Sequence, residues 1–184
     1  MDISRALTVD GWMNEQELTW LADQASKHHT IVEIGSFLGR STRALADNTE
    51  GTVYAIDYWL GPTEICMAPW DREQLYDHFC FNLSDLIDSK KVIPIKCNSH
   101  KVELDVVPDM VFIDGDHAYD SVVADIKKWR HLDFVCGHDY SWSTVKQAVG
   151  ELLPGAMHVE NTDIWTWRKG SRSSPCPAHQ NRQP

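Results

Sequence analysis

Short apolar runs recur along the chain, and amphipathic segments separate them. The runs are residues 31–34, 52–57, 91–96, 109–114 and 132–136. The segments at 41–47, 71–87, 119–129 and 145–153 carry apolar side chains at helical spacing, as does an earlier one that follows Asn14. Strands that alternate with helices predict βαβ units, and therefore a mostly parallel sheet with helices on both faces.

The two ends of this pattern differ from its middle. Asn14 and Glu17 have the spacing of a capping box, so we expect a helix to begin there. Residues 156–160 and 164–168 are two strand-like runs with only a turn between them, which predicts an antiparallel strand. The expected fold is α/β, a Rossmann-like seven-stranded mostly parallel sheet with one antiparallel edge strand and helices on both faces.

Length and composition limit the other possibilities. The chain has 184 residues, enough for one domain, which we expect at 1–169, before a disordered tail at 170–184 that has little to bury. Its net charge of −10 disfavours nucleic acid and acidic membranes as partners. The five cysteines form no C-x-x-C pair, and we find neither a secretory signal nor a bilayer-length apolar run. A cytoplasmic protein is expected.

Glycines follow the first strand, where a parallel sheet binds its ligands. The stretch Glu33-Ile34-Gly35-Ser36-Phe37-Leu38-Gly39 leads into a helix. Glycine lets the backbone approach a ligand, and the helix offers free N–H groups. A dinucleotide site would have a glycine where Phe37 stands, so NAD is disfavoured.

Two polar residues end the next strands. Asp57 closes the second strand and could accept both hydroxyls of a ribose, and Asn98 follows the third, where it could meet adenine. Either could instead be an ordinary residue of its loop: Asp57 as a loop cap, Asn98 as part of a polar turn.

Acidic residues and histidines gather after the fourth and fifth strands. Asp114, Asp116 and His117 follow one strand, and His138 and Asp139 follow the other. Carboxylates held close together repel unless a proton or a cation intervenes. Asp114, His138 and Asp139 would suit Mg²⁺ or Mn²⁺ better than Zn²⁺. The alternative is that these residues cap helices and that no metal is needed.

Four motifs together resemble a known family. They are V-E-I-G-S-F-L-G-R-S-T at 32–42, A-I-D at 55–57, F-I-D-G-D-H-A-Y at 112–119 and G-H-D-Y at 137–140. They are similar to the class I S-adenosylmethionine-dependent methyltransferases, most of all to the small O-methyltransferase-like group related to the macrocin and rhamnosyl O-methyltransferases. The resemblance covers roughly residues 30–168 and implies the seven-stranded sheet expected above.

The resemblance also implies roles for individual residues. It places S-adenosylmethionine against Glu33, Gly35, Ser36, Gly39, Asp57, Asn98 and Asp114. It implies a Mg²⁺ ion held near the acceptor hydroxyl by Asp114 and Asp139, to which we add His138. A base matching Asp116 or His117 would take the proton of the acceptor.

The expected reaction is O-methylation of a small-molecule hydroxyl. An apolar acceptor wall could be formed by Trp59, Trp70, Tyr76, Tyr140 and Trp142. The alternative is that most of these aromatics pack in the core, which is what we expect for Trp129, Trp165 and Trp167. We do not expect the long N-terminal extension with which several relatives cover their acceptors, and therefore expect a pocket that is open or completed by another subunit of a homo-oligomer. Two alternatives are a non-catalytic module that binds S-adenosylmethionine for a partner enzyme, and a nicotinamide-dependent oxidoreductase.

Overall fold

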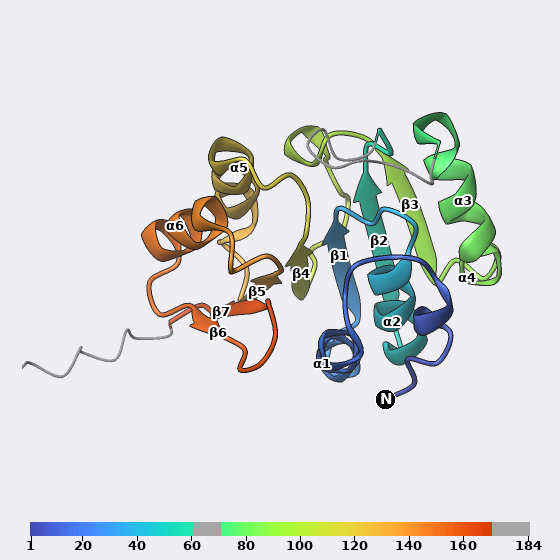
Figure 1. Ribbon diagram of the computed structural model, residues 1–184, viewed down its shortest axis with the longest axis horizontal. Helices are drawn as coiled ribbons and strands as arrows, with labels where there is room; N and C mark the ends of the chain where they lie inside the picture. The colour runs from blue at the N-terminus through green and yellow to red at the C-terminus, as the bar shows by residue number, and fades with distance from the viewer. Residues whose placement is uncertain (61–70, 171–184) are drawn as a thin grey trace, which may run out of the picture.

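One seven-stranded sheet organises the computed structural model, which describes residues 1–60 and 71–170 (Figure 1). The strands are β1 (Thr30–Ile34), β2 (Thr52–Asp57), β3 (Val92–Lys96), β4 (Met110–Ile113), β5 (Phe134–Gly137), β6 (Met157–His158) and β7 (Trp165–Arg168). The α-helices are α1 (Glu15–Ala25), α2 (Arg40–Asn48), α3 (Leu75–Asn82), α4 (Ser84–Asp88), α5 (Tyr119–Trp129) and α6 (Ser143–Leu152). Short 3₁₀ turns cover Ala6–Thr8, Arg72–Gln74 and Ser99–Lys101.

The strand order is β3-β2-β1-β4-β5-β7-β6. β1 pairs in parallel with β2 and β4, and the parallel pairing continues outward to β3 and β5. β7 is antiparallel to both of its neighbours. The expected Rossmann-like fold is confirmed, and the antiparallel strand lies one place in from the edge because the two-residue strand β6 covers it.

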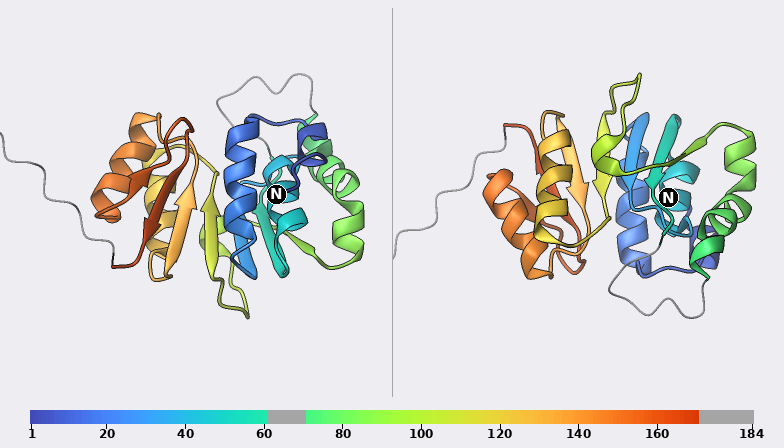
Figure 2. Two further views of the ribbon diagram at one scale, coloured as in Figure 1. Left: turned by 90° about the horizontal axis from the view of Figure 1, so that it is seen from below. Right: turned by 90° about the horizontal axis from the view of Figure 1, so that it is seen from above.

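Helices pack on both faces of the sheet, as expected (Figure 2). Successive strand residues point to opposite faces, so Ile31 of β1 packs in the core with α1 to α4 while Val32 packs in the core with α5 and α6. Both residues are fully buried. The parallel strands therefore bury both faces and place their carboxyl ends along one shared edge.

The N-terminus of α1 has the capping box that the sequence predicts. The Asn14 side chain accepts hydrogen bonds from the N–H groups of Gln16 and Glu17, at 2.9 and 3.1 Å. The Glu17 carboxylate accepts in return from the Asn14 N–H at 2.9 Å. These bonds satisfy donors that the first helical turn leaves open, and they fix where α1 begins.

The helix expected at 71–87 is broken at Leu83, whose backbone leaves the helical region at φ −116° and ψ 16°. The break lets the Leu83 side chain pack beneath Gly39 in the core. Asn82 donates through its side-chain amide to the Leu38 carbonyl at 2.9 Å. Packing against the loop before α2 thus replaces one long helix by α3 and α4.

Three further observations concern the chain as a whole. The cysteines at 80, 97 and 136 are free thiols. Among residues 1–60 and 71–170, no helix has the length and apolar character needed to cross a bilayer. The tail expected at 170–184 lies, beyond Gly170, outside the described residues.

Candidate functional site at the carboxyl edge of the sheet

The glycines after β1 are required by the protein's own packing. Gly35 has φ +87°, and a Cβ there would lie 1.9 Å from the Asp114 carbonyl oxygen. Gly39 has φ +95° at the N-cap of α2, and a Cβ there would lie 2.8 Å from Leu83 Cδ1. The turn between β1 and α2 therefore lies directly against the end of β4, which brings the two groups of predicted site residues together.

Glu33 is completely buried next to this turn. Its Oε2 accepts a hydrogen bond from Ser36 Oγ at 2.7 Å and a very short one from Thr42 Oγ1. Burial raises the pKa of Glu33, although the hydroxyls of Ser41, Thr42 and Ser36 oppose that rise. Its Oε1 has no hydrogen-bond partner among the described residues. A buried acceptor without a donor is the kind of atom that a bound ligand satisfies.

Asp57 ties the loop after β2 to the glycine turn. Its carboxylate accepts from the Phe37 N–H at 2.8 Å and from the Trp59 N–H at 2.7 Å. Burial raises the pKa of Asp57, although the N–H groups of Trp59 and Phe37 favour the ionised form. Each carboxylate oxygen has a second lone pair, so the position still fits the ribose hydroxyls of an adenosine.

The side chain of Asn98 hydrogen-bonds to the backbone of its own loop, after β3. Its side-chain oxygen accepts from the His100 N–H at 2.7 Å, at the start of the 3₁₀ turn. The polar-turn alternative therefore describes the oxygen of Asn98, and its amide nitrogen is the group that could meet an adenine.

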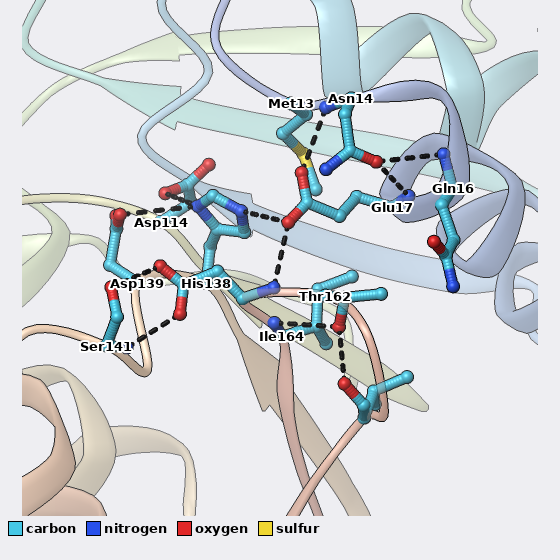
Figure 3. Close-up of polar contacts among 12 residues, drawn as sticks. Met13, Asn14, Gln16, Glu17, Asp114, His138, Asp139, Ser141, Thr162 and Ile164 are labelled. Atoms are coloured by element: carbon cyan, nitrogen blue, oxygen red, sulfur yellow. Dashed lines mark hydrogen bonds and ion pairs between the residues drawn. The ribbon is translucent and has the colours of Figure 1, made fainter.

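Asp114, His138 and Asp139 converge after β4 and β5 (Figure 3). One donor atom from each lies within 4.8 Å of the others. His138 Nδ1 is 3.5 Å from Asp139 Oδ1 and 3.7 Å from Asp114 Oδ1. These distances exceed those of charge-assisted hydrogen bonds and leave space for a cation between the three atoms. Two carboxylates and one imidazole fit a divalent metal such as Mn²⁺.

The protonation states of this cluster are strongly coupled. Burial opposes protonation of His138, but Asp139, Glu17 and Asp114 outweigh it and raise the pKa of His138 to about 11. Burial raises the pKa of Asp114 to about 7, helped by Asp139 and opposed by His138. Burial likewise opposes ionisation of Asp139, yet His117 and His138 hold its pKa well below the usual value. The imidazolium of His138 thus partly neutralises the carboxylates, and a metal would have to displace its Nδ1 proton.

His117 and Asp116 have different surroundings, although they are adjacent in sequence. His117 Nε2 lies 2.7 Å from Asp139 Oδ2, and its ring packs at 4.6 Å against Trp142. Asp116 instead accepts from the Ala118 N–H at 3.1 Å and from Ser121 Oγ at 2.6 Å. Burial opposes the ionisation of Asp116, but these two bonds keep its pKa low. Of the two candidate bases, His117 is therefore the better placed to take a proton.

Sequence reasoning missed the part that Glu17 has in this site. Its Oε1 lies 3.1 Å from His138 Nε2 and accepts from the Asp163 N–H at 2.8 Å (Figure 3). Glu17 is 3% exposed. The capping-box spacing identified this residue only as a helix cap, and no local pattern links it to residue 138.

The expected aromatic wall is only partly present. Trp59 is 2% exposed and packs in the core, where its indole N–H donates to the Phe37 carbonyl at 2.7 Å, so the core alternative holds for this residue. Tyr76 packs edge-on against Trp59, and Tyr140 stacks on His158. Trp142, 40% exposed, lies next to His117. Trp70 lies outside the described residues.

The remaining tryptophans follow the core prediction in two of three cases. Trp129 and Trp165 are buried in the core with α5 and α6. Trp167 is half-buried against that core, and its indole N–H donates to the Pro154 carbonyl at 3.1 Å. Trp165 also borders the site, because it lines the same pocket as Asp114 and His138 and its indole N–H donates to the His138 carbonyl at 3.2 Å.

Comparison with known sequences identifies the family. A family model described as a methyltransferase domain matches residues 32–134. An uncharacterized protein of Acanthamoeba polyphaga mimivirus is 30% identical over 139 residues, which are 67% of this chain and 59% of that protein. The chain thus spans about three-fifths of the length of this curated relative.

Solved structures share the fold. The S-adenosylhomocysteine-bound methyltransferase PaMTH1 of Podospora anserina has a TM-score of 0.62 at 14% identity, covering 85% of this chain and 80% of its own. Cofactor-bound Rv0187 from MTB has a TM-score of 0.63 at 17% identity, covering 94% and 87%. A caffeoyl-CoA O-methyltransferase candidate from Staphylococcus aureus has a TM-score of 0.58 at 18% identity, covering 86% and 85%. The chain belongs to the methyltransferase-domain family, and its fold is that of the class I S-adenosylmethionine-dependent methyltransferases.

Proposed function

We propose that this protein transfers the methyl group of S-adenosylmethionine to a hydroxyl oxygen of a small molecule. The observation that carries the proposal is the pair of His117 and Asp139, 2.7 Å apart, beside the Asp114–His138 cluster and against the glycine turn. A histidine oriented by a carboxylate is a suitable general base for a hydroxyl proton. The O-methyltransferase candidates among the proteins that share the fold agree with this acceptor class.

The residues of the glycine turn would hold the cofactor. Glu33 presents its unpartnered Oε1 to a donor, and Asp57 presents two oxygens to ribose hydroxyls. The turn itself, with Gly35, Ser36 and Gly39, keeps the backbone compact and lies against the backbone of Asp114. The amide nitrogen of Asn98 would face the adenine. When bound, the cofactor supplies a methyl group already activated on a sulfonium, so alignment is the main task left to the protein.

The acceptor side would be organised by the residues after β4 and β5. A divalent cation held by Asp114, His138 and Asp139 would supply positive charge near the acceptor oxygen and lower its pKa. His117 takes the hydroxyl proton at Nδ1 while Asp139 holds Nε2. With S-adenosylmethionine bound, the acceptor oxygen would receive the methyl group as the carbon–sulfur bond breaks, and the electron pair of that bond would remain on sulfur in S-adenosylhomocysteine. Trp142 borders His117, where an apolar acceptor would pack.

Calorimetric titration of the protein with S-adenosylhomocysteine, with and without Mn²⁺ and with NAD as a control ligand, tests the cofactor half of this proposal. We expect saturable binding to one site that is lost in Asp57→Ala, and no binding of NAD. Methyl transfer from labelled S-adenosylmethionine to a panel of phenols, sugars and amines then tests the acceptor half. Binding without transfer to any hydroxyl compound would favour the non-catalytic module, and transfer to amines alone would contradict O-methylation.

A further inference from the structure

Glu17 occupies an unusual place for a helix-capping residue. It belongs to the first turn of α1, yet its side chain is buried beside His138 at the carboxyl edge of the sheet (Figure 3). A capping box needs only a side-chain oxygen that accepts the N-cap N–H, and a glutamine provides one as well as a glutamate. The negative charge of Glu17 therefore needs another explanation, because burial of a charge is costly unless it is paired.

The contacts of Glu17 join three distant segments. Its Oε2 accepts from the Asn14 N–H at 2.9 Å, and its Oε1 accepts from the Asp163 N–H at 2.8 Å and lies 3.1 Å from His138 Nε2. Asp163 in turn accepts from the Ser141 N–H at 2.6 Å and from Ser141 Oγ at 2.7 Å. Glu17 thus contacts the imidazole of His138 directly and supports the loop after β5 through the β6–β7 turn.

The ring of His138 lies between the Glu17 carboxylate and two aspartates. Its Nε2 faces Glu17, while its Nδ1 faces Asp114 and Asp139. A carboxylate next to one nitrogen of a metal-binding histidine fixes the orientation of the ring, so that the other nitrogen is directed at the metal position. The positive φ of Asp139, 58°, shows that the loop bearing it is held in a restricted conformation.

We propose that Glu17 is a positioning residue of the methyl-transfer site: it holds His138 with Nδ1 directed at Asp114 and Asp139, so that a divalent cation binds there. This inference rests on the proposed function and extends it to a residue of α1. Partners of this kind typically change metal affinity about 10- to 100-fold when they are removed.

The experiment compares Mn²⁺ binding to the full chain and its variants by calorimetry, with S-adenosylhomocysteine titrated separately. Glu17→Gln keeps an acceptor for the Asn14 N–H and removes the charge next to His138. We expect it to weaken Mn²⁺ binding by about 10- to 100-fold, with S-adenosylhomocysteine affinity unchanged. The spin-echo modulation of bound Mn²⁺ should show a directly bound nitrogen in the wild type and lose it in the variant.

Asn14→Ala is the matched control, because it removes the side chain that caps α1 and leaves the Glu17 carboxylate in place. It should lower the thermal midpoint by roughly 2–4 °C and leave Mn²⁺ affinity unchanged. Wild-type Mn²⁺ affinity in Glu17→Gln, or an equal loss in Asn14→Ala, would overturn the proposal. Should Glu17→Gln not fold, Glu17→Asp keeps the charge but withdraws it from His138, and it should weaken Mn²⁺ binding likewise.

Two outcomes in the wild type separate this inference from the proposed function. Binding of S-adenosylhomocysteine without any binding of Mn²⁺ would overturn the role of Glu17 and the cation, and would leave a methyltransferase that uses His117 alone. Failure to bind S-adenosylhomocysteine would contradict the proposed function itself.

Discussion

His117 Nε2 lies 2.7 Å from Asp139 Oδ2, although the two residues follow different strands. β4 and β5 are parallel neighbours, so the loops after them leave the sheet at the same edge. In the proposed mechanism, Asp139 orients one nitrogen of His117 and the other nitrogen takes the acceptor proton. Asp116, the residue before His117, instead accepts hydrogen bonds from Ala118 and Ser121 near the start of α5.

Replacing His117 should therefore affect catalysis more than replacing Asp116. We expect His117→Gln to lower the rate of methyl transfer by about 10²–10⁴-fold, because a positioned general base contributes that much. The affinity for S-adenosylhomocysteine should stay unchanged. Single-turnover assays with an acceptor found in the panel, together with calorimetry, measure both quantities.

Asp116→Asn is the control for this comparison. It weakens the hydrogen bonds from the Ala118 N–H and the Ser121 hydroxyl and should lower stability by about 1 kcal/mol, with methyl transfer largely retained. A greater loss of rate in Asp116→Asn than in His117→Gln would assign the base to Asp116.

Gly35→Ala should damage the site and the fold together. The added Cβ would lie 1.9 Å from the Asp114 carbonyl oxygen, and φ is +87°. Because both the contact and the dihedral involve backbone, relaxation would separate β1 from β4, and we expect a loss of more than about 3 kcal/mol. Urea unfolding monitored by tryptophan fluorescence measures it.

Gly150→Ala provides the opposite expectation at another glycine. Gly150 lies in α6, and a Cβ there would meet nothing within 4 Å. Alanine has the higher helix propensity, so this variant should gain up to about 1 kcal/mol. A similar loss in both variants would contradict the argument from local geometry.

Asp85 offers a comparison of two arginines that pair with the same carboxylate. Arg43 is 1% exposed and binds both Asp85 oxygens, at 2.7 and 2.8 Å, as well as Asp47. Arg5 also pairs with Asp85, at 2.8 Å, but the side chain of Arg5 is 55% exposed. We expect Arg43→Ala to cost about 3–5 kcal/mol and Arg5→Ala less than about 1 kcal/mol. Chemical denaturation of both variants checks the ranking, and equal losses would contradict it.

Asp125 should make stability depend on pH. It is 2% exposed in α5, and burial raises its pKa. A hydrogen bond with Ser99 and the charges of His100 and Lys128 act in the opposite direction but do not cancel this rise. A carboxyl group whose pKa is raised by folding destabilises the folded state when ionised. The penalty is present above the raised pKa and disappears as pH falls below the unfolded value of 3.8.

Asp125→Asn removes this ionisation. The variant should be more stable than the wild type near neutral pH, and its advantage should shrink as pH falls toward about 4. Denaturation curves of the two proteins over that range measure the difference. An advantage that grows as pH falls would contradict the assigned sign.

Much of the fold could be predicted from the sequence because the relevant signals are local. The periods of apolar residues identified the five parallel strands and the helices to within a few residues. The Asn14–Glu17 spacing placed the start of α1, since a capping box involves residues three apart. The positions of Gly35, Asp57 and Asp114 at strand ends followed from the same pattern, because parallel strands share one carboxyl edge.

Other features depend on which distant segments meet, and only the tertiary structure decided them. The break at Leu83 coincides with its packing beneath Gly39, and Trp59 is buried by packing against Tyr76 and Phe79. The sequence by itself determined that Glu17 caps a helix. The tertiary fold decided that the same carboxylate lies against His138 and the Asp163 N–H, because a buried charge takes its partner from whichever segment the fold brings within reach.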